Sequence, residues 1–96
     1  MGYEMQTTFW QDFTIAEAFG PAAVVDTFER AFREWRGNTV YITELALVMN
    51  WKCWKHYEDG NMEFSRMYSD YYYIVRDWCL DNLEGEDFEY YYRMTD

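Results

Sequence analysis

Glycine interrupts this chain at four internal positions, and between them apolar residues recur with the spacing of a helix. These positions are Gly20, Gly37, Gly60 and Gly85, and Pro21, which suits the first turn of a helix, follows the first of them. No stretch alternates apolar and polar residues for long enough to indicate a strand. The pattern predicts an all-α fold, a compact bundle of four to five helices.

The expected helices form a single domain over residues 1–96 and include a short C-terminal one. Thr14 and Glu17 have the spacing of a capping box, so the first helix is expected to restart at Thr14. The first expected helix runs from Thr7 or Thr8 through Phe13, the second covers residues 21–36 with Gly37 as the stop, and the third runs from about 40 to 58. The fourth runs from Asn61 as the cap to about 83, and the fifth covers residues 88–93.

The segment from about 40 to 58 is apolar on two almost opposite sides, so it is predicted to be covered by neighbours on both sides and to be the centre of the fold. An extended start is the alternative, since Val40, Ile42 and Thr43 are β-branched. One apolar side comprises Ile42, Leu45, Ala46, Met49, Cys53 and Tyr57, and the other comprises Val40, Leu47, Trp51 and Trp54.

Strong acidity is combined here with many aromatic residues. The net charge is −10 over 96 residues, and 23% of the residues are Phe, Trp or Tyr. The aromatic residues supply the apolar surface of a folded core, so the acids are expected to surround a folded domain. Such a surface attracts basic proteins and repels nucleic acid and anionic membranes. The longest apolar runs have five residues and no signal peptide is visible, which predicts a soluble, cytoplasmic protein.

The expected fourth helix carries a row of acids beside its predicted core face, which comprises Phe64, Met67, Tyr71, Ile74, Val75 and Trp78. The row is interrupted only by Arg66, Tyr73 lies next to it, and Glu86 and Asp87 prolong it. Like charges four residues apart repel, so the row is locally unfavourable and indicates a partner-binding surface. The alternative is that acids only keep a tyrosine-rich protein soluble. The row comprises Glu63, Asp70, Asp77, Asp81 and Glu84.

The tyrosines near these acids are expected to divide between core and surface. Packing between helices, with only the hydroxyl in water, is expected for Tyr71 and Tyr91 more than for Tyr73 and Tyr92, and some of the tyrosines are expected to show a ring edge and hydroxyl to solvent. Exposed tyrosine beside carboxylate suits arginine and lysine, through ion pairing and cation–π contact.

Residue patterns for catalysis or metal binding are absent from the sequence. His56 is the only histidine, and Cys53 and Cys79 lie too far apart along two expected antiparallel helices for a disulfide or a zinc set. The alternation of Asp59, Asn61 and Glu63 fails as a calcium loop, because helix is expected where the loop should continue. We therefore expect no enzymatic activity, no cofactor and no metal.

Three strings resemble small acidic proteins of bacterial conjugative elements and phages. They are TFWQDF at 8–13, NWKCW at 50–54 and YYRMTD at 91–96. The resemblance implies a mobile element that must survive host defence or be regulated. Within that setting, one hypothesis is a DNA-mimic inhibitor of a restriction, CRISPR or repressor protein. The other is a scaffold or homodimer that uses Trp10, Trp51, Trp54 or the tyrosine clusters as an apolar patch.

Overall fold

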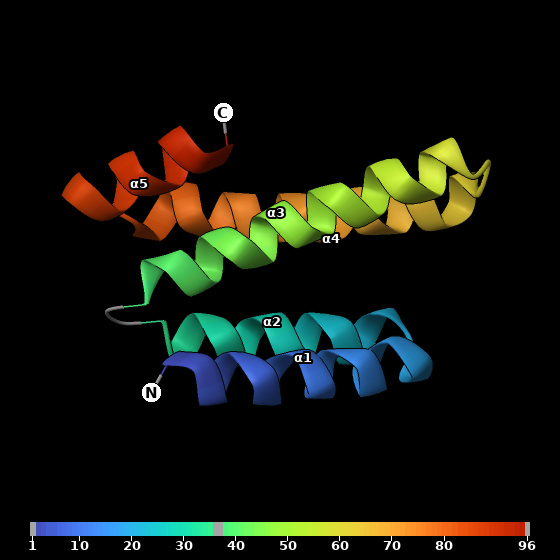
Figure 1. Ribbon diagram of the computed structural model, residues 1–96, viewed down its shortest axis with the longest axis horizontal. Helices are drawn as coiled ribbons and strands as arrows, with labels where there is room; N and C mark the ends of the chain where they lie inside the picture. Colours follow the sequence, from blue (N-terminus) through green and yellow to red (C-terminus); the bar gives the residue numbers. More distant parts are fainter. Residues whose placement is uncertain (1, 36–37, 96) are drawn as a thin grey trace.

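The computed structural model describes the backbone of residues 2–35 and 38–95, and within these ranges the side chains from Phe9 onward. Nearly all of this part of the chain is helical (Figure 1). The helices are α1 (Gly2–Phe19), α2 (Pro21–Arg33), α3 (Thr39–Glu58), α4 (Met62–Asn82) and α5 (Gly85–Thr95). No strand occurs in the described ranges, so the all-α prediction is confirmed.

The helices form two antiparallel hairpins, one packed over the other (Figure 1). α1 turns into α2 at Gly20, where φ is 117°, and α3 turns into α4 through Gly60, where φ is 79°. Glycine reaches both angles without the steric penalty that a Cβ brings. α5 packs on α3 and α4, on the side of that hairpin away from α1 and α2 (Figure 1).

A single apolar cluster draws side chains from all five helices. Phe13 of α1 stacks on Phe28 of α2 with ring centroids 6.0 Å apart, and Phe28 meets Tyr71 of α4 edge-on at 5.6 Å. From α3, Ile42 and Leu45 are completely buried within this cluster. The prediction of a central helix over about 40–58 is confirmed, and its start is helical despite the β-branched residues there.

The first hairpin differs from expectation at two points. α1 begins at Gly2 and continues through Thr14 without a break, because the Thr14 hydroxyl donates to the Trp10 carbonyl at 2.9 Å instead of capping a new helix. α2 ends at Arg33 instead of continuing to 36. The expected stop at Gly37 lies outside the described residues.

The expectation that α3 is covered on two sides is wrong. Its residues Ile42, Leu45, Ala46 and Met49 are buried, but Tyr57 on the same side is exposed. The members of the second apolar side are all exposed, because α1, α4 and α5 contact other sides of the helix and no described segment covers this one. The exposed members are Val40, Leu47, Trp51 and Trp54.

Candidate protein-binding surface

The predicted acids lie on the side of α4 that faces away from the core. We call Glu63, Asp70, Asp77, Asp81 and Glu84 the acidic ridge. All five are exposed, the first four on α4 and Glu84 just after it. The buried residues of α4 fall on the opposite side of a helix with 100° per residue. They are Ser65, Tyr68, Tyr71, Val75 and Cys79.

The core face of α4 is rotated relative to the prediction. Phe64, expected inside, is 53% exposed, and Met67 and Trp78 are only half-buried, whereas Ser65 is buried. The Ser65 hydroxyl donates to the Cys53 carbonyl at 3.0 Å, which holds this turn of α4 against α3. The rotation moves the acidic ridge from beside the core face, where it was expected, to the side opposite it.

Little of the ridge is neutralised within the molecule. Arg76 lies 3.8 Å from the Asp77 carboxylate in an exposed ion pair, a type that contributes about 0–1 kcal/mol. Over the described ranges 9–35 and 38–95, the other four ridge carboxylates have neither an ion pair nor a hydrogen bond. The ridge therefore keeps nearly all of its negative charge.

Tyrosine and arginine lie together next to the ridge. Tyr73 is exposed, and the Arg76 guanidinium lies over its ring, 5.7 Å from the centroid. Tyr71 and Tyr91 are buried while Tyr73 and Tyr92 are exposed, so the division of tyrosines expected from the sequence is confirmed. The Arg76 guanidinium therefore contacts both the Tyr73 ring and the Asp77 carboxylate at the edge of the ridge.

Glu86 and Asp87 do not continue the ridge. Both are exposed residues of the first turn of α5, and they border a shallow depression of about 520 Å³ shared with Thr39 and Val40 of α3. The Asp87 carboxylate accepts a hydrogen bond from the Thr39 hydroxyl at 2.8 Å. These two acids therefore lie on the α3 side of the hairpin, and Asp87 also holds α5 to α3.

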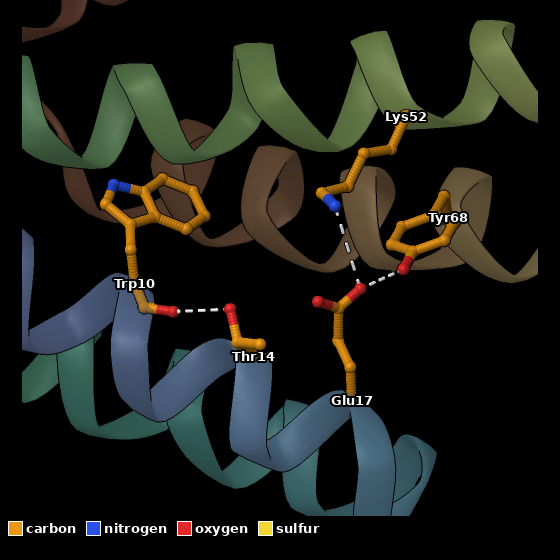
Figure 2. A network of polar contacts seen from close by, with 5 residues as sticks. All are labelled: Trp10, Thr14, Glu17, Lys52 and Tyr68. Carbon is orange, nitrogen blue, oxygen red and sulfur yellow. Dashed lines mark hydrogen bonds and ion pairs between the residues drawn. The ribbon is translucent and has the colours of Figure 1, made fainter.

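A polar cluster that the sequence did not predict joins three helices (Figure 2). Glu17 of α1 accepts a hydrogen bond from the Tyr68 hydroxyl of α4, and the Lys52 ammonium of α3 lies 3.8 Å from the same carboxylate oxygen. Lys52 also lies between two rings, 5.9 Å from the Phe13 centroid and 5.5 Å from the Tyr68 centroid. Burial, with the hydrogen bond to Glu17, raises the pKa of Tyr68, so the hydroxyl remains a donor. No local sequence pattern pairs residues so far apart.

The side chains with catalytic or metal-binding potential are scattered or buried. Within the described part of the chain, no three His, Cys, Asp or Glu residues lie close enough to hold a metal ion. Both cysteines are free, and burial raises the pKa of the Cys79 thiol to about 12. His56 stacks on Tyr68 with ring centroids 5.2 Å apart. These side chains pack the bundle.

None of the described helices combines the length and apolar content needed to cross a membrane. Comparison with known protein families, with curated proteins and with solved structures gives no match to this chain.

Proposed function

We propose that this chain is an acidic protein-binding module whose ridge binds the basic surface of a nucleic-acid-binding protein. The observation that carries the proposal is the position of the ridge, opposite the core of α4 and almost free of internal countercharge. Carboxylates repeated along an exposed helix repel one another, so a partner that brings positive charge reduces this electrostatic repulsion.

The spacing of the ridge supports mimicry of a nucleic-acid strand. Glu63, Asp70 and Asp77 are seven residues apart, which is about 10 Å of helix axis. Phosphates along one strand of B-DNA rise by about 3.4 Å each, so the ridge offers a charge at about every third phosphate position. A groove that tracks a phosphate backbone is therefore a suitable partner.

The chemistry around Tyr73 supports arginine as the partner's main contact. Arg76 already places its guanidinium over the Tyr73 ring and beside the Asp77 carboxylate. A planar guanidinium suits both contacts better than an ammonium does. A partner arginine that reached this part of the ridge would meet a ring and a carboxylate arranged in the same way.

The resemblance to proteins of conjugative elements and phages gives the proposal a setting. The chain would act in the cytoplasm as an inhibitor of a restriction, CRISPR or repressor protein by occupying its nucleic-acid site. Direct binding to nucleic acid or an anionic membrane is disfavoured by the net charge of −10.

Displacement of labelled duplex DNA from purified restriction, CRISPR and repressor proteins tests the proposal. We expect displacement of DNA from at least one of them at low salt and a steep loss of it at high salt. The triple variant Asp70→Asn, Asp77→Asn, Asp81→Asn should lose the effect.

A matched control removes the same charge elsewhere. Asp26→Asn, Glu34→Gln and Glu58→Gln change three exposed acids outside the ridge and should leave displacement nearly intact. If the two triple variants lose activity equally, net charge is responsible and the ridge is not a site. Failure to displace DNA from any of the proteins would refute the mimicry.

A further inference from the structure

Two tryptophans stand out on the uncovered side of α3. Trp51 is 63% exposed and Trp54 is 57% exposed, although tryptophan normally buries most of its large ring. Val40 and Leu47 lie on the same side of the helix and are exposed as well. We call these four residues the aromatic face. An apolar row of this length on a small acidic protein indicates an interaction surface.

The aromatic face lies on the side of α3 opposite its buried residues and away from α4. Figure 1 looks down the shortest axis, and α3 and α1 lie nearer the viewer than α4 and α2. Trp10 of α1 reaches toward α3 (Figure 2), and it borders a shallow, mostly apolar depression of about 760 Å³. The side seen in Figure 1 measures 38 by 27 Å, enough for the roughly 800 Å² per partner that a stable dimer buries.

Charge on this side is less negative than along the acidic ridge. Both lysines of the described chain belong to α3, with Lys55 exposed and Lys52 held by Glu17. Glu44 and Glu58 lie on the same side of α3 as Lys55. Two copies that each carry −10 repel, and the repulsion is weaker at a face that carries bases as well as acids than at the acidic ridge. The acidic ridge lies on the far side of α4.

We infer that the aromatic face binds a second copy of this chain, with the two α3 helices antiparallel about a two-fold axis. Centring the axis between residues 49 and 50 brings each Lys55 level with the partner's Glu44 and each Trp51 level with the partner's Val48. Glu44 also interacts within its own chain. The pairing covers the tryptophans and leaves both acidic ridges exposed.

A second copy fits this face better than a basic partner does. A basic protein is drawn to the uncompensated ridge, whereas a surface that carries charges of both signs around an apolar centre can be complementary to itself. The inference is independent of the proposed function, because the two surfaces share no residue.

Sedimentation equilibrium over a wide concentration range tests the inference. The wild type should be a dimer at high micromolar concentration. Trp51→Glu should weaken the dimer by at least about 30-fold, the effect of removing an interface hot spot. Tyr73→Glu, the same type of change beside the ridge, should leave it unchanged. A wild type that stays monomeric at millimolar concentration, or equal weakening by both variants, would overturn the inference.

Charge exchange tests the register. Lys55→Glu and Glu44→Lys each place like charges across the antiparallel pair, so each variant alone should self-associate less than the wild type. Mixed together, they should form a heterodimer in which both pairs are restored. Melting curves of each variant by circular dichroism confirm that it is folded. A mixture that associates no better than its components would reject this register and with it the proposed pairing.

Salt separates this inference from the proposed function. Added salt screens the repulsion between two acidic copies, so the dimer should be unchanged or strengthened. The same salt should weaken a complex formed through the ridge. A dimer that dissociates as salt rises would contradict an interface centred on apolar side chains, whatever the ridge does.

Discussion

The outer sides of α3 and α4 belong to one hairpin and face away from each other, yet they carry opposite chemistry. α3 exposes two tryptophans with valine and leucine, while α4 exposes a line of carboxylates. Their inner sides are similar, since both bury mainly apolar residues in one core. This burial predicts that the free energy of unfolding depends mainly on the inner sides. If the acids served only solubility, they would be expected beside the exposed tryptophans, where α3 instead carries lysine as well as glutamate.

The largest expected effect tests whether the outer side of α3 contributes to folding. Leu45 is 0% exposed and Leu47, two residues further on, is 37% exposed. Leu45→Ala should lower the free energy of unfolding by about 2–5 kcal/mol, because it leaves a cavity. Leu47→Ala should change it by less than about 0.5 kcal/mol. Urea titration of the monomer measures both, and similar losses would mean that the outer side is part of the core.

A second prediction concerns the inner side of α4. Tyr68→Phe removes the hydroxyl that donates to Glu17 and leaves a half-buried carboxylate with Lys52 alone. The free energy of unfolding should fall by about 1–3 kcal/mol. Tyr91→Phe is the control, since the buried Tyr91 hydroxyl has no hydrogen-bond partner in the described structure and its loss should be neutral or stabilising. If chemical denaturation showed the same loss in unfolding free energy for the two variants, the cluster of Glu17, Lys52 and Tyr68 would not contribute to stability.

The pH dependence of stability should reflect the buried groups. Burial raises the pKa of Cys79 from 9.0 to about 12 and also raises the pKa of Tyr68 and Tyr91 above 10.0. A group whose pKa is higher in the folded state stabilises the fold while it is protonated. Its contribution to stability is complete below the pKa of the unfolded state and is lost as pH rises through the pKa of the folded state. Stability should therefore decline from about pH 9 upward. Cys79→Ala should make the decline in stability between pH 9 and 12 less steep, and thermal melts at increasing pH measure this.

Next in size is the effect of the internal arginine on the ridge. Arg76→Ala frees the Tyr73 ring and the Asp77 carboxylate, whereas Arg66→Ala removes an exposed base that contacts neither. Affinity for an oligo-arginine peptide should rise about two- to fivefold more for Arg76→Ala than for Arg66→Ala. Calorimetric titration at low salt measures the difference. Equal gains would mean that only net charge matters.

The smallest expected effect concerns the two ends of the ridge. Asp81 lies in the last turn of α4, at the negative end of the helix dipole, while Glu63 lies in the first turn, at the positive end. Asp81→Asn should raise Tm by about 1–3 °C, and Glu63→Gln should lower it by a similar amount. Differential scanning calorimetry resolves shifts of this size. Shifts of the same sign would argue against the dipole explanation.

Helix content was predictable because its signals are local. Gly20 and Gly60 mark turns that the chain does make, and the spacing of Tyr71 and Tyr73 correctly separated a buried from an exposed tyrosine. The helix start expected at Thr14 was wrong, because a threonine hydroxyl serves equally well as a cap or as a donor to the preceding turn. The exposure of the ridge acids followed from their spacing alone.

The sequence by itself determined the helical segments, the turns between them and the negative charge, because each depends on residues within a turn or two of one another. Only the tertiary structure decided which apolar side of α3 is covered and that Glu17, Lys52 and Tyr68 meet. The covered side of α3 and the contact among these three residues both depend on how the helices pack against one another. With α1, α4 and α5 packed around α3, no described segment remains to cover Trp51 and Trp54.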